Sequence, residues 1–306
     1  MQFAIGFPLP HHPLNPDFVT PDFIAEFARV AEESGFRGAY LTEHPIPSDR
    51  WLQAGGHDAL DPFVALAFVA AATQSMRLIT NLTVVPYRNP FLLAKTVATL
   101  DRFSGGRLTL GVGTGYLKPE YFAMGVDFDE RNALFDESLE VCRLTWTGNS
   151  VSYDGRHFSA RANTALPTPV QDPLPVWIGG NSKLSRRRVA ERAQGWMPMP
   201  NPSGPLAAAR RSPVLETLEQ LDEMLDYVRE HAASVGRTDP VDVMYMSFEG
   251  GVPGEPDWNQ AAHIADVQAQ AALGVTWQAV NAVGSTRREV LDMVRAYGDT
   301  VISALR

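Results

Sequence analysis

The stretch "GRLTLGVGTGY", residues 106–116, combines an alternating apolar pattern with four glycines. Leu108, Leu110 and Val112 recur at every second position, as expected for a strand with a buried face. Glycine has no Cβ, so the end of this strand can approach a flat or anionic ligand closely. The stretch therefore predicts a strand that ends in a ligand-binding loop. The alternative is that Gly113–Gly115 forms only a tight exit from the strand.

Short apolar runs of this kind alternate with amphipathic segments along the whole chain. The strands are predicted at residues 2–7, 38–42, 76–85, 108–112, 176–179, 195–199, 241–248 and 275–283. Helices are predicted to open at the pairs Thr20-Pro21, Asp61-Pro62, Asn89-Pro90 and Ser212-Pro213, and to span residues 129–146, 183–193, 257–273 and 285–305. Eight strands and eight helices in strict order predict an α/β fold, a closed parallel (β/α)8 barrel. An open doubly wound sheet is the alternative.

Residues 148–175 interrupt this order. "VSYDGRHFS" alternates around Asp154-Gly155 as a β-hairpin does, and "LPTPVQDPLP" is too rich in proline for a regular element. We therefore expect residues 1–306 to form a single barrel domain with TIM-barrel architecture, with a hairpin and a proline-rich insertion at about 148–175.

Composition restricts the classes of function. The 306 residues carry a net charge of −9, which argues against nucleic acid as the main partner. The single cysteine, Cys142, excludes an intrachain disulfide framework and a multi-cysteine metal site, and suits a reducing cytoplasm. The first residues lack a basic signal region, and no apolar stretch reaches the roughly 18 residues that a membrane span needs. The histidines lack metal-ligand spacing, so no metal site is predicted.

Candidate catalytic residues follow the second predicted strand. In such barrels the ligands bind to the loops after the carboxyl ends of the strands. Glu43 and His44 lie in such a loop, and an imidazole at the barrel mouth can move a proton near neutral pH. The alternative is a histidine that only hydrogen-bonds to the loop backbone.

"WIGGNS", residues 177–182, is the second glycine-rich loop, and the next helix begins directly after it. Main-chain amides at a helix N-terminus, with the Asn181 amide and the Ser182 hydroxyl beside them, would form a cradle for phosphate. Gly179 and Gly180 could equally be a plain strand-to-helix turn. A dinucleotide fingerprint is excluded in the first loop, because Tyr116 stands where its third glycine is required.

The segments "ESGFRGAYLTEH", "VPYRNP", "LAKTVATLDRFSGGRLTLGVGTGY", "FDERNALFDESLEVCRLTWTG" and "PVWIGGNSKLSRRRVAERAQGW" cover most of residues 1–200. They resemble the luciferase-like monooxygenases, in particular the branch that uses the deazaflavin coenzyme F420. The resemblance implies a (β/α)8 barrel with insertions, a small-molecule substrate and a homodimer. It also implies F420 as the cofactor, with FMN as the alternative.

The resemblance further assigns cofactor-binding residues. It implies a bulge with a non-prolyl cis peptide near Thr80, Asn81 and Leu82, against which the ring of the cofactor lies. It implies that two loops hold the tail and the phosphate. The residues of these loops are Gly113, Thr114 and Gly115, and Gly179, Gly180, Asn181 and Ser182.

One position departs from a relative in the family. A deazaflavin-using sugar-phosphate dehydrogenase has a catalytic glutamate directly after Gly-Thr-Gly, whereas this chain has Tyr116, and Glu120 follows four residues later. The departure disfavours a sugar-phosphate substrate and leaves His44 as the best candidate for proton transfer, with Tyr116 or Glu120 as further candidates. The sequence thus predicts an F420-dependent oxidoreductase. The alternatives are a two-component monooxygenase that uses reduced FMN, or a non-catalytic flavin-binding barrel.

Overall fold

The computed structural model describes residues 1–9, 12–204, 210 and 212–306, and the strands of this part close into a parallel barrel. Neighbouring strands pair in the order of the chain, and pairing of β1 with β11 and of β3 with β5 completes the ring. The strands are β1 (Gln2–Gly6), β2 (Gly38–Leu41), β3 (Arg77–Thr80), β4 (Thr83–Val84), β5 (Leu108–Gly113), β8 (Val176–Gly179), β9 (Gly195–Met197), β10 (Asp242–Met246) and β11 (Trp277–Asn281). The predicted barrel is confirmed, and the open sheet is excluded.

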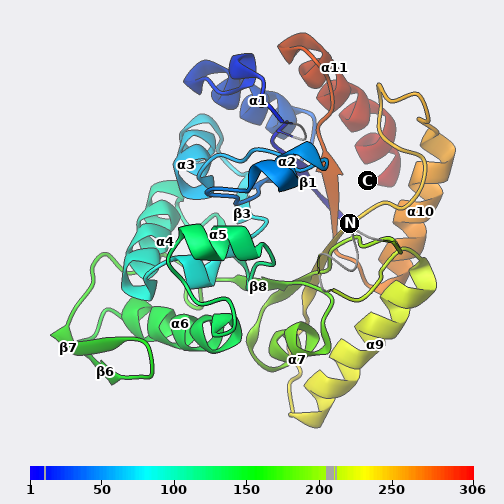
Figure 1. Ribbon diagram of the computed structural model, residues 1–306. Helices are drawn as coiled ribbons and strands as arrows, with labels where there is room; N and C mark the ends of the chain where they lie inside the picture. Colours follow the sequence, from blue (N-terminus) through cyan, green and yellow to red (C-terminus); the bar gives the residue numbers. More distant parts are fainter. Residues whose placement is uncertain (10–11, 205–209, 211) are drawn as a thin grey trace.

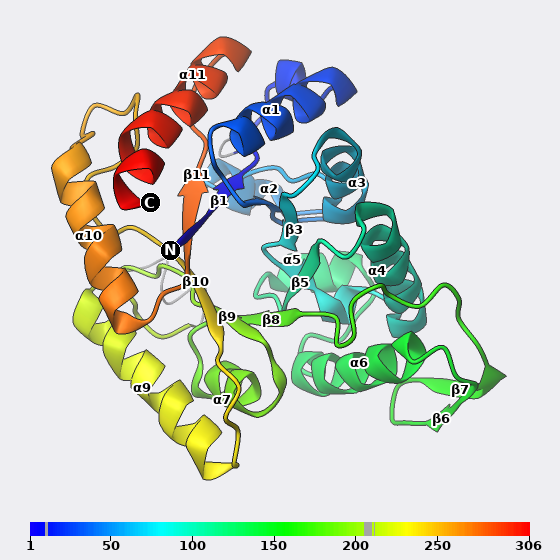
Figure 2. The ribbon, with the colours of Figure 1, turned by 180° about the vertical axis from the view of Figure 1, so that it is seen from behind.

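A ring of helices surrounds the barrel (Figure 1). The long helices are α1 (Pro21–Glu33), α3 (Pro62–Ala72), α4 (Pro90–Ser104), α6 (Arg131–Trp146), α7 (Lys183–Arg192), α9 (Leu218–Ser234), α10 (Gln260–Leu273) and α11 (Arg287–Tyr297). The shorter ones are η1 (Pro16–Phe18), α2 (Asp49–Gln53), η2 (Val85–Tyr87), α5 (Lys118–Ala123), the π-helical η3 (Gly298–Ile302) and η4 (Ser303–Leu305). Seen from behind, α2 and α5 lie on the far side of the barrel, whereas the two termini lie together at the near end (Figure 2).

Several element boundaries confirm the sequence prediction. Thr20, Asp61 and Asn89 each cap a helix that begins with proline, and their side chains accept hydrogen bonds from the first turn. The predicted hairpin is also present, as the antiparallel pair β6 (Val151–Asp154) and β7 (Ser159–Asn163).

Other boundaries were predicted wrongly. The helix expected to open at Ser212-Pro213 begins at Leu218, because Leu215 pairs with Asn201 in a β-bridge and Thr217 supplies the cap. The predicted run 76–85 is not one strand but two, β3 and β4, separated at residues 81–82.

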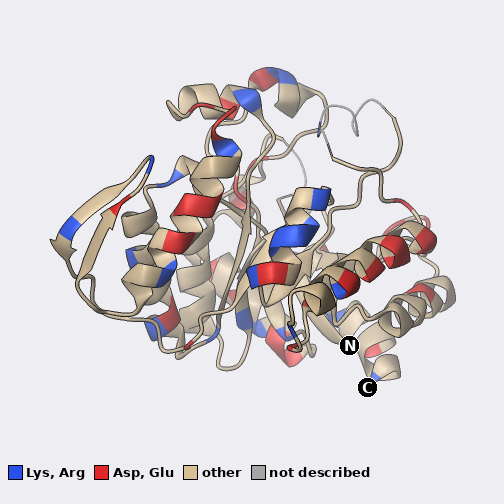
Figure 3. Cartoon of the chain, turned by 90° about the horizontal axis from the view of Figure 1, so that it is seen from below, with Lys and Arg blue, Asp and Glu red and all other residues tan. Residues whose placement is uncertain are grey.

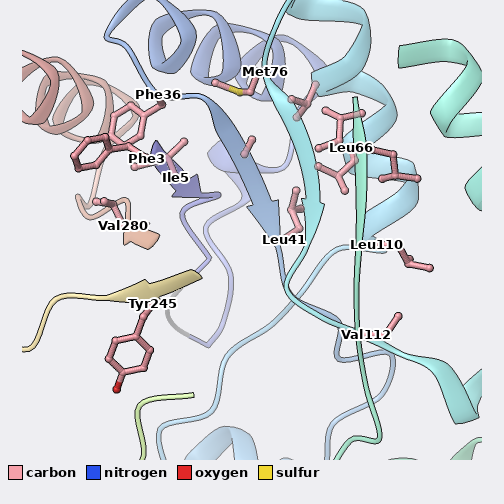
Figure 4. Close-up of a cluster of buried hydrophobic side chains, with 14 of the residues drawn as sticks. Phe3, Ile5, Phe36, Leu41, Leu66, Met76, Leu110, Val112, Tyr245 and Val280 are labelled. Carbon is pink, nitrogen blue, oxygen red and sulfur yellow. The ribbon is translucent and has the colours of Figure 1, made fainter. Parts of the chain in front are cut away.

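The hydrophobic core has two layers. One lies between the strands and the helices and contains Leu108, Leu110 and Val112, each fully buried; Figure 4 shows the last two on β5. The other fills the barrel and includes Trp177 and Trp277, whose ring centroids are 5.8 Å apart. The alternating apolar pattern therefore marks the helix-facing side of β5.

The basic run Arg186–Arg188 packs against protein groups. Arg187 pairs with Glu191 at 2.7 Å, and Arg188 pairs with Asp136 of α6 at 2.6 Å. Acidic and basic segments are interspersed along the outer helices (Figure 3). In the described part of the chain, no helix combines the length and the apolar character that crossing a membrane would require.

The glycines of β5 face the barrel interior and make room for the segment that separates β3 from β4. A Cβ at Gly111 would overlap the main-chain carbonyl oxygen of Thr80, and one at Gly113 would lie 2.7 Å from the Leu82 side chain. Gly179 of β8 meets the same leucine from the other side. These positions exclude side chains because the Thr80 carbonyl and the Leu82 side chain occupy the space that side chains would fill.

We expect Gly111→Ala to lower the free energy of unfolding by about 1–3 kcal/mol or more, since the clash is with backbone that cannot rotate away. Gly113→Ala is the matched control, because its contact is the end of a leucine side chain, and it should cost less. Urea denaturation of both variants measures the difference. Equal midpoints for Gly111→Ala and wild type would contradict this account of the glycine run.

Candidate active site

A cavity of about 550 Å³ lies at the carboxyl ends of β2, β5, β8 and β9. Its walls include Gly113–Tyr116 after β5 and Gly179–Ser182 after β8, two segments far apart in the sequence. Asn81 and Leu82 from the segment between β3 and β4, and His44 from the loop after β2, complete the part of the wall that the sequence predicted. The two glycine-rich loops therefore border one cavity. We call it the mouth cavity.

His44 is held by a buried carboxylate. Its Nδ1 lies 3.3 Å from Oε1 of Glu120, which is only 1% exposed, and the Tyr87 hydroxyl donates to Oε2 at 3.2 Å. Where the Glu120 oxygen accepts this hydrogen bond, the Nδ1–H of His44 is the donor. The Nε2 of His44 has no hydrogen-bond partner in the described part of the chain and can accept or give a proton. Burial raises the pKa of Tyr87, and Glu120 raises it further, so this phenol stays a donor.

Aromatic rings pack around His44. The Trp51 ring lies 4.5 Å from it, that of His57 lies 5.0 Å from it, and that of Tyr116 lies 6.3 Å from it, measured between centroids. The Nδ1–H of His57 donates to the carbonyl oxygen of Asp58 at 2.9 Å, which leaves its Nε2 as an acceptor. Burial lowers the pKa of His57 and so favours the neutral ring. Sequence reasoning missed His57, because nothing in its local pattern marks it.

Glu43 is bound to structural partners. Its Oε2 accepts from the Val84 amide at 2.6 Å, and its Oε1 accepts from Arg88 Nε at 2.9 Å. Arg88 also donates to Asp61 at 2.8 Å. Burial raises the pKa of Glu43, and the charge of Arg88 opposes that shift. Glu43, predicted among the catalytic residues, lies in the wall of the mouth cavity, and its hydrogen bonds to Val84 and Arg88 anchor β4 next to the bulge.

The bulge between β3 and β4 contains a cis peptide bond between Asn81 and Leu82, where the resemblance implied one. Thr80 is fully buried and donates to the carbonyl oxygen of Gly111 at 2.7 Å, so its side chain faces protein. Asn81 and Leu82 line the mouth cavity, whereas Thr80 is not part of its wall. Of the three predicted residues, two are therefore placed to contact a ligand.

The loop after β5 is fixed from behind. Gly115 has a φ of +68°, in the left-handed region, and a Cβ at this position would lie 2.7 Å from the Val84 side chain. The carbonyl oxygen of Thr114 accepts a hydrogen bond from the Tyr121 hydroxyl. These contacts hold the loop in one conformation at the cavity wall.

The side chains of the second loop are used inside the protein. The Asn181 amide donates to the carbonyl oxygens of Met199 at 2.7 Å and Pro213 at 3.1 Å. The Ser182 hydroxyl caps α7 by accepting from the Ser185 amide at 3.0 Å. The groups that remain for an anion are main-chain amides at the start of α7, which have no intrahelical acceptor. The predicted cradle is thus one of backbone, with Asn181 and Ser182 shaping it.

Two guanidinium groups that sequence reasoning missed also line the mouth cavity. The Nη1 of Arg131 lies 4.0 Å from the carboxylate oxygen Oδ1 of Asp129. Arg210 donates to the carbonyl oxygen of Pro200 and to Asn201 Oδ1, both at 3.4 Å, and makes no ion pair within the described residues. Both arginines can therefore compensate the charge of an anionic ligand.

Comparison with known proteins identifies the family. The sequence model of the luciferase-like monooxygenase family matches residues 1–249, which is most of the chain. The chain belongs to the luciferase-like monooxygenase family. The structure of the monooxygenase RslO1 from Streptomyces bottropensis superposes with a TM-score of 0.80 over 100% of both chains, at 21% sequence identity, and so shares the fold.

Two relatives of this chain with named activities use different cofactors. An uncharacterized protein of Mycobacterium tuberculosis is 34% identical over 200 residues, 60% of this chain and 68% of the relative. An F420-dependent glucose-6-phosphate dehydrogenase of Nakamurella multipartita is 29% identical over 233 residues, 75% of this chain and 64% of the relative. An FMNH(2)-dependent dimethylsulfone monooxygenase of Pseudomonas putida is 30% identical over 179 residues, 57% of this chain and 47% of the relative.

The hydrogen bond from Tyr87 to the buried Glu120 carboxylate leads to a stability prediction. We expect Tyr87→Phe to lower the free energy of unfolding by about 1.5–3 kcal/mol, because the buried Glu120 carboxyl group loses a hydrogen-bond donor that water cannot replace. Tyr227→Phe on α9, which removes a half-buried hydroxyl outside this network, is the control and should change stability little. Chemical denaturation measures both, and an unchanged midpoint for Tyr87→Phe would contradict a structural role for this bond.

Proposed function

We propose that this chain is an oxidoreductase that uses coenzyme F420 and transfers hydride between the deazaflavin and a small organic substrate. The observation that carries the proposal is the mouth cavity, where His44 on its buried carboxylate, the Asn81-Leu82 bulge and both glycine-rich loops meet. The match to the F420-dependent relative extends over 75% of this chain, against 57% for the FMNH(2)-dependent one. The two relatives match at similar identity, 30% and 29%, so the preference for F420 rests on the cationic groups of the cavity wall.

The chemistry of the cavity wall fits such a cofactor. Main-chain amides at the start of α7 would hold a phosphate group. Arg131 and Arg210 would face the further negative charges that F420 carries on its carboxylate tail. Asn81 and Leu82 would support the ring, because Gly113 and Gly179 hold Leu82 in place from both sides.

The deazaflavin, when bound, supplies the hydride chemistry at its C5 carbon. The contribution of the protein is the proton. On oxidation of an alcohol, whose hydride the bound cofactor would take, Nε2 of His44 would accept the O–H proton as the C=O bond forms. With Nδ1–H donating to Glu120, Nε2 would be the base of the neutral ring, and the carboxylate beside it would stabilise the imidazolium that results. The reverse reaction returns the proton to the carbonyl oxygen.

A titration of the purified protein tests the cofactor. We expect F420 to bind with saturable quenching of its fluorescence, and FMN to bind much more weakly, because the arginines compensate the longer anionic tail. Replacing Arg210 by Met should weaken F420 more than FMN. Tight binding of FMN alone would instead support the two-component monooxygenase, and binding of either cofactor without turnover of any substrate would support the non-catalytic barrel.

Substitution of His44 tests the proton transfer. We expect His44→Ala to lower turnover about 10²-fold or more, which is typical for loss of a general base, while F420 affinity stays close to that of wild type. The assay follows loss of F420 absorbance with a panel of neutral alcohols, over a range of pH. The control is His231→Ala, whose imidazole pairs with Glu191 on the outside of the barrel. Equal turnover in His44→Ala would reject the role of His44.

A further inference from the structure

A second cavity, of about 340 Å³, lies beside the mouth cavity, in the centre of the barrel opening. It is bordered by the carboxyl ends of β1, β2, β9, β10 and β11, and we call it the inner chamber. The two cavities share a wall, which consists of Thr42, His57, Asn81, Met197, Pro198 and Pro200. A molecule in the inner chamber therefore lies directly next to the proposed cofactor site.

The lining of the inner chamber is apolar and carries no formal charge. Its larger aliphatic and phenyl side chains are Phe7, Leu9, Leu60, Met197, Met244 and Met246, and the rings of Tyr40 and Tyr245 join them. No lysine, arginine, aspartate or glutamate belongs to its wall among the residues that the structure describes. An ionised group placed here would lose its hydration without gaining a counter-charge, which is strongly unfavourable.

Two polar side chains of the shared wall, His57 and Asn81, have hydrogen-bonding groups that are free within the described part of the chain; Tyr40, Tyr245 and Asn281 are the polar side chains elsewhere in the lining. The Nε2 of His57 is an acceptor without a hydrogen-bond partner in the described residues. The side-chain amide of Asn81 makes no hydrogen bond within the same residues, and it suits a carbonyl oxygen. The shared wall therefore offers a donor to the oxygen of both members of an alcohol and ketone pair.

On the side away from the mouth cavity, the surroundings of the inner chamber are acidic. A third cavity, of about 1150 Å³, adjoins it through Leu9, Met246, Ala279 and Asn281. Its wall includes four carboxylates that form no ion pair in the described part of the chain, and within that part it includes no lysine or arginine. These carboxylates are Glu249, Glu255, Asp257 and Glu289. Their field raises the energy of an anion in the neighbouring inner chamber.

We propose that the inner chamber binds the organic substrate and selects a small, uncharged molecule, with an apolar body among the methionines and a single hydroxyl or carbonyl group at the shared wall. There the Asn81 amide donates to the substrate oxygen, and the hydroxyl hydrogen is left for His44, whose ring centroid lies 5.0 Å from that of His57. The chamber excludes phosphorylated and carboxylated substrates. The assignment of the occupant as substrate rests on the proposed F420-dependent function, whereas the selection of neutral over anionic ligands follows from the chamber alone.

The test uses protein labelled with ¹³C at its methionine methyl groups and two probes that share a ring. Cyclohexanone is neutral, and 4-oxocyclohexane-1-carboxylate adds one negative charge. We expect cyclohexanone to shift the signals of Met197, Met244 and Met246 saturably, while the exposed Met124 stays unchanged. The carboxylate analogue should shift none of them at the same concentration. Single Met→Leu substitutions assign the signals.

A charge substitution reverses the expected preference. Met246→Lys should admit the carboxylate analogue, whereas the matched variant Met246→Leu should keep the preference for cyclohexanone. Equal shifts with both probes in wild type, or no shift with cyclohexanone, would overturn the proposal even if the lysine variant does not fold.

Fluorescence quenching of F420, measured on the same preparation, separates the two proposals. Quenching without methionine shifts would overturn the substrate assignment and leave the cofactor proposal standing. Methionine shifts without quenching would overturn the cofactor proposal, while the selection of neutral ligands by the inner chamber would stand.

Discussion

The close contact between residues 80–82 and the glycines of β5 and β8 organises the barrel opening. Gly111 leaves space for the carbonyl of Thr80, and Gly113 and Gly179 hold Leu82 between them. This contact interrupts the predicted third strand and brings Asn81 and Leu82 to the cavity wall. The glycine run thus contacts another segment of the protein first, and it shapes the cavity wall through that segment.

The same end of the barrel contains a buried acid–base pair. Glu120 is contributed by α5, a six-residue helix after β5, and its carboxylate lies between His44 and Tyr87. A buried carboxylate is stable only with such partners. The three residues come from three successive strand-to-helix connections, so the closure of the barrel is what creates the pair.

Charge is distributed unevenly across the barrel opening. The mouth cavity has Arg131 and Arg210 in its wall, the inner chamber has no charged side chain among the described residues, and the third cavity has carboxylates without arginine or lysine among those residues. The proposed anionic cofactor would therefore bind in the mouth cavity and the proposed neutral substrate in the inner chamber next to it. Electrostatics at this scale separates ligands by charge before any specific contact is made.

The barrel can be predicted from local signals, since apolar periodicity and the caps at Thr20, Asp61 and Asn89 are retained in the closed structure. The position of the two glycine-rich loops at one opening can be predicted as well, because the parallel strands of a barrel end on the same side. The contact of Glu120 with His44 and the position of His57 between two cavities become visible only in the folded chain. Those side chains lie in connecting segments whose paths depend on packing between distant elements, and no periodic pattern in the sequence records such packing.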